Sequence, residues 1–194
     1  MITTTHKYLI FILLFTSVAS GIAQNKFKKN DTSVRTKVLV SDTLYSNKSF
    51  VENIETINNF SLFISLFKNS GHSERIQDQG LYSIFIFDNE VINATFDEEE
   101  LEELLTSEGQ SRLNELFSYH IIPGSVDKHS LVTEIRKRGG EVSYRTLGGK
   151  TITFKQNGEN FYIQDGESVS NIIYFDYFYN NGTIHVVDKI IQNH

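Results

Sequence analysis

The histidines are the residues of this chain best suited to metal or acid–base chemistry, but their spacing does not assemble a site. Four of the six lie well inside the chain, at His72, His120, His129 and His185. No two of these are four residues apart, the spacing that places two imidazoles on one helix face for zinc. The sequence also has no Gly-x-Ser-x-Gly nucleophile motif and no cysteine. We therefore expect no metal, no cofactor and no enzymatic activity.

A run of acidic residues is the strongest charge feature. Six of the seven residues at 97–103 are carboxylates: Asp97, Glu98, Glu99, Glu100, Glu102 and Glu103. A calcium loop needs carboxylates that converge from a turn containing glycine. These residues instead lead a predicted helix, where negative charge complements the helix dipole, so we interpret the run as a solvated helix face. With a net charge of -6, the chain also lacks the positive surface that nucleic acids require.

Five of the six residues from Tyr174 to Tyr179 are aromatic. Successive side chains of a strand point to opposite faces, so these rings cannot all face the core. We expect Tyr174, Tyr177 or Tyr179 to show a ring to solvent near the turn at 180–182. Exposed tyrosines offer sugars or protein partners a large contact area at low entropic cost. The alternative is that these rings only cover the edge of the sheet.

The first 23 residues have the order of a secretory signal peptide. Lys7 precedes an apolar run from Tyr8 to Val18, and small residues follow at 19–21 and 23. A membrane anchor is the alternative, but a spanning helix needs about 20 apolar residues. We expect removal of 1–23 and export to the periplasm, the cell surface or the medium. Residues 24–47 are polar and predict an N-terminal tether or a loosely docked first strand.

The remaining chain predicts an α+β domain with helices first and strands later. Capping-box spacings at Ser49/Glu52, Thr95/Glu98 and Ser107/Gln110 predict three helix starts, and Asp127 predicts a fourth. Residues 82–87 are apolar on both alternating faces and predict a strand covered on both sides. From residue 141 the hydrophobic period changes to two, with turn signals at 148–149, 157–158, 165–166 and 180–182.

Three segments in the right order resemble the signatures of fasciclin-like domains. Residues 116–124 (LFSYHIIPG) resemble the Tyr-His segment, and residues 181–191 (NGTIHVVDKII) resemble the C-terminal Asn-Gly-x-Ile-His strand. Residues 82–92 are similar to the first signature, with Ile86-Phe87 in place of the usual Ala-Pro and Asp88 in place of Thr. The resemblance covers residues 48–192. It implies a twisted β-sandwich or wedge with a helical layer.

The resemblance also implies a function. Fasciclin-like domains are extracellular adhesion or binding modules without enzymatic activity, and their partners are extracellular proteins, matrix or polysaccharides. Tyr119 and His120 occupy the Tyr-His segment that serves receptor adhesion in animal members. From the residues alone, we expect His120 on a strand, where its imidazole hydrogen-bonds neighbouring backbone.

The predicted function is a secreted, non-enzymatic module that binds an extracellular polysaccharide or a cell-surface protein. The candidate binding residues are Tyr119, His120, Tyr174, Tyr177 and Tyr179. A periplasmic accessory subunit or a small-ligand carrier is the alternative, and a large apolar cavity beneath the aromatic run would support it. The sequence leaves the ligand and the oligomeric state open.

Overall fold

The computed structural model describes residues 33–78 and 80–191. Val34 to His194 form one compact unit, and the description below concerns that unit. The predicted signal peptide, residues 1–23, lies outside the described residues. Within the described part, no helix is both long and apolar enough to cross a membrane.

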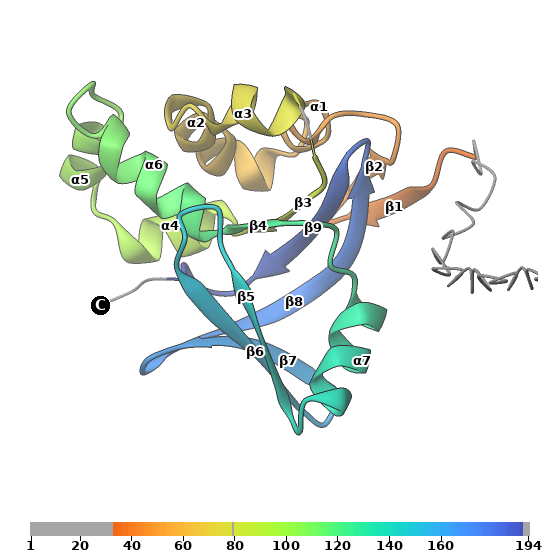
Figure 1. Ribbon diagram of the computed structural model, residues 1–194. Helices are drawn as coiled ribbons and strands as arrows, with labels where there is room; N and C mark the ends of the chain where they lie inside the picture. Colours follow the sequence, from red (N-terminus) through yellow and green to blue (C-terminus); the bar gives the residue numbers. More distant parts are fainter. Residues whose placement is uncertain (1–32, 79, 192–194) are drawn as a thin grey trace, which may run out of the picture. The chain divides into compact units, whose positions relative to one another are not determined.

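Short helices make up most of the first half, and strands make up the second half (Figure 1). The helices are α1 (Phe50–Ile54), the 3-10 helix η1 (Asn58–Phe60), α2 (Ser61–Asn69), α3 (His72–Asp78), α4 (Asn89–Thr95), α5 (Glu98–Leu104), α6 (Gln110–Tyr119) and α7 (Lys128–Lys137). The strands are β1 (Thr36–Leu39), β2 (Asp42–Tyr45), β3 (Tyr82–Ile86), β4 (Ile121–Pro123), β5 (Glu141–Arg145), β6 (Thr151–Asn157), β7 (Asn160–Asp165), β8 (Ser168–Tyr179) and β9 (Gly182–Val187).

Local side-chain chemistry explains where several helices begin. Ser49 and Glu52 form the predicted capping box at α1, and Asp127 caps α7 by accepting the backbone N–H of Ser130 at 2.7 Å. The predicted box at Thr95/Glu98 is wrong, because Thr95 ends α4 and the box of α5 is Asp97 with Glu100. The box predicted at Ser107/Gln110 is also wrong, since the residue before α6 is Gly109 and it makes no side-chain cap.

Seven strands form one mixed sheet in the order β4-β3-β9-β8-β7-β6-β5. β3 and β9 pair in parallel, and all other neighbours pair antiparallel. The sheet curls so that its ends approach each other, and the Leu147 N–H donates to the Ile121 carbonyl at 2.7 Å across the gap. The α+β class with a curved, nearly barrel-shaped sheet and a helical layer is therefore confirmed.

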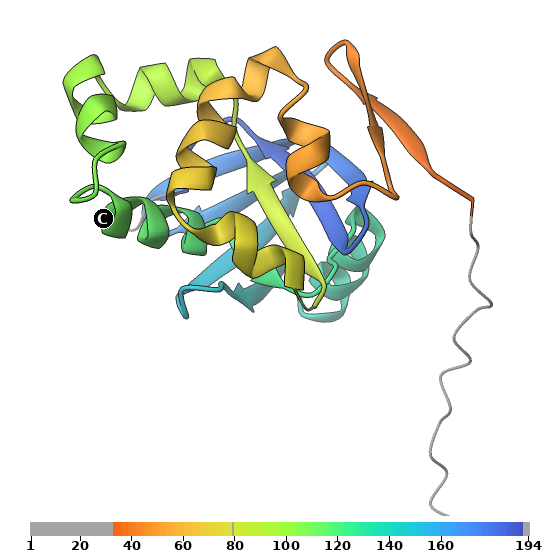
Figure 2. The same ribbon diagram turned by 90° about the horizontal axis from the view of Figure 1, so that it is seen from above.

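Within one apolar core, the aromatic contacts form two groups on the two sides of the central strands. On one side, α1 to α6 cover β3, β4 and β9 (Figure 2). Rings of α1, α2 and α6 pack there with Phe87, which follows β3: Phe50, Phe63, Phe67 and Phe117. On the other side, α7 closes the curved sheet over a second group: Phe85, Phe154, Phe161, Phe175 and His185. β3, which lies between the groups, is buried on both faces as predicted.

The N-terminal segment forms two paired strands, where the sequence predicted a tether or a loosely docked first strand. Residues 36–45 form the antiparallel β1–β2 hairpin, and Leu39 and Leu44 are each 1% exposed. Asn53 fixes the hairpin to α1, because its side-chain oxygen accepts the Tyr45 N–H at 2.7 Å and its amide donates to the Tyr45 carbonyl at 3.0 Å. The described part of this segment is therefore a docked hairpin. Two buried leucines hold it, although most of the segment is polar.

The turn between β8 and β9 requires glycine for a steric reason. A Cβ atom at Gly182 would lie 1.9 Å from the Tyr82 carbonyl oxygen and 2.7 Å from the Tyr179 hydroxyl. The preceding Asn181 donates its side-chain amide to the Ile76 carbonyl at 2.6 Å, so the turn is tied to α3 as well. This close approach of backbones sets the register of the central β3–β9 pair.

Candidate binding sites

The structure separates the three tyrosines that the sequence groups as one binding face. Tyr174 is 50% exposed, whereas Tyr177 and Tyr179 are 3% and 4% exposed. The register of β8 against β9 is irregular between Ile172 and Tyr174 and again between Tyr174 and Tyr177, so the alternation of faces is broken. Tyr179 turns into the helical layer and packs its ring 5.8 Å from that of Phe50. The assignment of Tyr177 and Tyr179 as surface binding residues is therefore corrected.

The β1–β2 hairpin explains why the aromatic run is covered. The Lys37 ammonium lies 4.5 Å from the centre of the Tyr177 ring and donates to the Phe175 carbonyl at 2.5 Å. The Arg35 guanidinium lies 4.1 Å from the centre of the Phe178 ring. Cations over ring faces stabilise such contacts electrostatically. The hairpin thus covers rings that the sequence left as exposed candidates.

What remains exposed on this strand is a stripe that we call the β8 face, formed by Val169, Ile173 and Tyr174. These side chains are 39%, 47% and 50% exposed. Val169 and Ile173 alternate with the buried Ser170 and Ile172, so they leave the same side of the strand. Hollows of about 620 and 500 Å³ lie on either side of Ile173.

Polar groups border the β8 face. Asp188 belongs to both hollows, and its carboxylate accepts the backbone N–H and the side-chain amide of Asn171, each at 2.7 Å. The hollow on the β7 side also contains Lys128, whose ammonium lies 5.2 Å from the centre of the Phe175 ring. The face therefore combines an exposed apolar stripe with fixed polar groups on its border, an arrangement typical of binding surfaces.

His120 is a buried structural residue. It is the C-cap of α6 and does not lie on a strand as predicted, because β4 begins one residue later, at Ile121. Its Nδ1 donates to the Leu116 carbonyl at 2.8 Å, and its Nε2 accepts the Ile191 N–H at 2.9 Å. Burial lowers the pKa of this imidazole to about 4, so the ring is neutral. The bonds join α6 to the C-terminal segment, which supports the backbone-bonding role expected from the residues alone.

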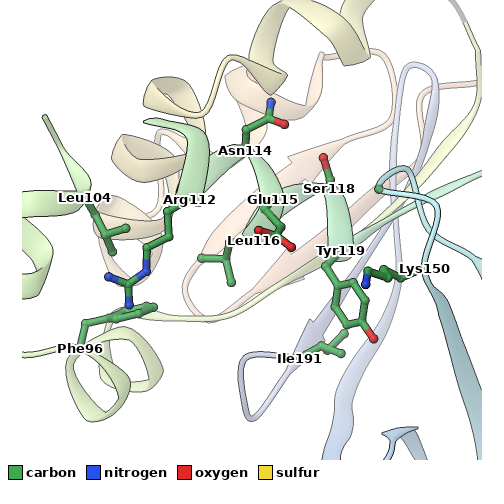
Figure 3. A pocket seen from close by; sticks show the side chains of 11 residues that line it. Phe96, Leu104, Arg112, Asn114, Glu115, Leu116, Ser118, Tyr119, Lys150 and Ile191 are labelled. Atoms are coloured by element: carbon green, nitrogen blue, oxygen red, sulfur yellow. The ribbon is translucent and has the colours of Figure 1, made fainter. Parts of the chain in front are cut away.

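The neighbouring Tyr119 lies at the wall of a cavity. It is 6% exposed, its hydroxyl donates to the Asp165 carboxylate, and its ring borders a cavity of about 460 Å³ (Figure 3). Burial, followed by the bond to Asp165, raises the pKa of the hydroxyl. The cavity lies between α5, α6, the β5–β6 turn and Ile191. The two residues of the Tyr-His segment therefore serve separate regions, the cavity wall and the core.

One arrangement near this cavity has the residue types of a catalytic triad but the wrong hydrogen-bond direction. His72 Nε2 lies 2.9 Å from Ser118 Oγ, and its Nδ1 lies 3.3 Å from Asn114 Nδ2. The Asn114 amide also donates to the Ser70 carbonyl at 3.1 Å, which fixes the amide orientation. Asn114 therefore donates to Nδ1, so the His72 proton sits on Nε2 and points at Ser118. An imidazole in that state cannot take the hydroxyl proton, and the array is a structural network.

The four histidines between residues 72 and 185 do not form one cluster. His72, His120 and His185 are fully buried in separate hydrogen-bonded positions, and His129 is exposed on α7. Among residues 33–78 and 80–191, no group of three or more histidine or acidic side chains could hold a metal ion. The acidic run forms α5 and its cap, with Glu98, Glu99 and Glu100 in the first turn. This placement agrees with the predicted solvated helix start.

Sequence reasoning missed two features of these sites. Val169 and Ile173 were not among the candidate binding residues, although they are 39% and 47% exposed on β8. The cavity beside Tyr119 unites α6 with the β5–β6 turn near Lys150, about thirty residues apart in the chain. No local pattern signals that approach, since the backbone bond from Gly148 N–H to the Ser118 carbonyl, at 3.1 Å, forms only in the folded chain.

Comparison with known proteins identifies the fold and the family. The family model described as "Fasciclin domain" matches residues 58–193. Protein sll1483 of Synechocystis sp. is 25% identical over 190 residues, which cover 96% of this chain and 97% of that protein. The structure of a FAS1 domain pair from the insect cell adhesion molecule Fasciclin I aligns with a TM-score of 0.66 at 13% identity, over 82% of this chain and 67% of that one.

These matches agree with the three signatures found in the sequence. The family match starts within the helical layer and includes both the Tyr-His segment and the Asn-Gly strand. The structural likeness, at low identity, supports the fold alone. Fasciclin domains are in general non-enzymatic adhesion modules, and they are typically extracellular or secreted. The chain belongs to the Fasciclin domain family.

Proposed function

We propose that this protein is an exported, non-enzymatic module that binds an extracellular polysaccharide or a cell-surface protein through the β8 face. The observation that carries the proposal is the exposure of Val169, Ile173 and Tyr174 within six residues of one strand. Exposed apolar groups that border polar ones are typical of interaction sites. Family membership supports a binding role, and the residue pattern of 1–23 supports export.

The polar border suits sugar hydroxyls or a protein rim. Asn171 and Asp188 hold each other through two 2.7 Å hydrogen bonds, so their free lone pairs and protons are presented in a fixed geometry. Ile173 lines both hollows beside Asp188, and the exposed Tyr174 ring that follows it in the strand offers a flat apolar surface. Because the Asn171 and Asp188 groups are already fixed, they lose little conformational entropy on binding, which favours recognition of a ligand such as a polysaccharide with repeating units.

The direction of the His72 hydrogen bonds supports the absence of enzymatic activity. The Ser118 hydroxyl lies beside the His72 imidazole, but it accepts a hydrogen bond from His72, whereas a nucleophile would have to donate one to the imidazole. A periplasmic accessory subunit or a small-ligand carrier remains the alternative function. The hollow nearest the aromatic run does not favour the carrier, because charged and amide side chains share its lining with Phe161 and Phe175.

The test is binding of the purified protein to a polysaccharide panel and to intact cells before and after protease treatment. A Tyr174→Ala/Ile173→Ser variant removes the centre of the face, and Val38→Ser removes an exposed valine of the hairpin, 58% exposed, as the matched control. We expect saturable binding that the β8 variant loses at least tenfold and the control keeps. Protease sensitivity of the cell signal separates a protein partner from a polysaccharide. Binding to neither target, or equal loss in both variants, would contradict the proposal.

A further inference from the structure

The cavity beside Tyr119 is separate from the β8 face and has the features of a small-molecule site. Its volume of about 460 Å³ lies within the ~300–1,000 Å³ range of ligand pockets. One part of its wall is apolar and consists of Phe96, Leu104, Leu116 and Ile191. Phe96, Leu104 and Ile191 are buried, so this wall is part of the packed domain and not a mobile surface. An apolar group of a ligand would lose water contact there.

The wall also carries charged side chains of both signs, which lie among the apolar ones. Lys150 and Glu115 line the cavity, and neither side chain has an ion-pair partner within 4 Å among the described residues. Arg112 is the third charged residue, but it lies 3.8 Å from Glu100 and 5.9 Å from the Phe96 ring centre. The Asp165 carboxylate behind Tyr119 is occupied by the tyrosine hydroxyl. One cation and one anion therefore remain for a ligand.

The backbone places Lys150 at the cavity. The turn before β6 is tied to α6 and β4, because Gly148 donates to the Ser118 carbonyl at 3.1 Å and Leu147 donates to the Ile121 carbonyl at 2.7 Å. The turn is closed internally as well, since the Thr146 N–H donates to the Lys150 carbonyl at 2.7 Å. Figure 3 shows the Lys150 side chain beside the Tyr119 ring, with Glu115 on the neighbouring helix α6. The backbone fold therefore places the Lys150 ammonium at the cavity without the help of an ion pair.

We propose that this cavity binds a small zwitterion with an apolar side chain, either a free amino acid or a dipeptide. The ligand carboxylate pairs with Lys150, its ammonium pairs with Glu115, and its side chain packs against Leu116 and Ile191. The carboxylate of a simple fatty acid would be repelled by Glu115. A ligand with only a positive charge would be repelled by Lys150 and Arg112. Opposite charges on one small ligand satisfy both unpaired groups.

The experiment is titration of the purified protein with L-phenylalanine and with L-leucyl-L-leucine, followed by backbone amide NMR and calorimetry. The two probes distinguish a free amino acid from a dipeptide. N-acetyl-L-phenylalanine lacks the ammonium, L-phenylalaninamide lacks the carboxylate, and L-serine lacks the apolar group. We expect saturable shifts around α6 and the β5–β6 turn for at least one probe. Removal of either charge should weaken binding about fivefold, the value of one partly solvated ion pair.

Matched variants link each charge to its partner. Lys150→Gln should weaken binding of the zwitterion about fivefold but leave the affinity for L-phenylalaninamide unchanged. Glu115→Gln should also weaken binding of the zwitterion about fivefold, but leave the affinity for N-acetyl-L-phenylalanine unchanged. Lys155→Gln is the control and should have no effect, because Lys155 lies five residues further along the chain, on β6, and is paired with Glu141 at 3.1 Å. Circular dichroism confirms that each variant is folded. Absence of saturable shifts, or equal affinity for charged and blocked probes, would overturn the proposal, whatever the β8 face binds.

Discussion

Two buried neutral histidines should make the stability of this domain fall sharply in mild acid. His120 and His185 have no exposed surface, and burial lowers the pKa of each to about 4. Both rings use one nitrogen as a donor and the other as an acceptor; His185 donates from Nε2 to the Val126 carbonyl at 2.8 Å and accepts the Asp176 N–H at 3.4 Å. A second proton would displace the backbone donor on the accepting nitrogen.

The sign and size of the effect follow from proton linkage. In the unfolded chain each imidazole returns to its ordinary pKa of 6.5, so below that pH the unfolded state binds protons that the folded state excludes. The contribution of these two histidines to stability is therefore constant above about pH 7 and is lost as the pH drops from 6.5 toward 4. Between pH 8 and pH 5 each histidine should lower the free energy of unfolding by about 2 kcal/mol, and the pair by about 4 kcal/mol. That is a large part of the ~5–15 kcal/mol of a typical domain.

Urea unfolding at pH 8, 7, 6 and 5, followed by circular dichroism, measures this directly. The useful quantity is the difference in unfolding free energy between pH 8 and pH 5, because it does not depend on how much a substitution destabilises the fold. His120→Gln and His185→Gln should each reduce the difference by about 2 kcal/mol. His129→Gln is the matched control; its ring is exposed, and the difference should stay unchanged. A wild-type difference below about 1 kcal/mol, or an equal reduction in the control, would refute the reasoning.

Three further predictions concern single positions. Gly182→Ala should destabilise the domain by about 3 kcal/mol in urea unfolding, since its Cβ would overlap the Tyr82 carbonyl; a loss below about 1 kcal/mol would show that the turn relaxes freely. Val40→Gly should stabilise it by about 1 kcal/mol, because a β-branched residue sits there at φ 59; no gain in melting temperature would contradict the strain. Histidine-selective ¹⁵N NMR near pH 7 should find His72 neutral with its proton on Nε2, and a proton on Nδ1 would reopen Ser118 as a nucleophile.

Much of the fold follows from short-range patterns in the sequence. Ser49 and Asp127 cap the helices that they were predicted to cap, because a side-chain oxygen reaches only the backbone N–H groups of the next turn. The doubly apolar run at 82–86 became a strand buried on both faces. The boxes at Thr95 and Ser107 failed because several acids and hydroxyls compete within a few residues there, and spacing alone does not choose among them.

The binding sites depended much more on the tertiary structure. Tyr174 was correctly expected at the surface, but the composition that suggested it gave equal weight to Tyr177 and Tyr179. The left-handed Asp176, at φ 59, breaks the alternation of β8 between Tyr174 and Tyr177. Lys37 of the docked hairpin covers Tyr177, and Tyr179 packs against Phe50 in the helical layer.

By itself, the sequence determined the starts of α1 and α7, the central strand, the α+β class and the three ordered signatures of the family, since each rests on residues close together in the chain. Only the tertiary structure decided which rings reach solvent, in which direction the His72 proton points, and that Lys150 meets Glu115 across one cavity. These depend on the curvature of a seven-stranded sheet and on contacts between distant segments. Such contacts form when the whole core packs, and no local pattern encodes them.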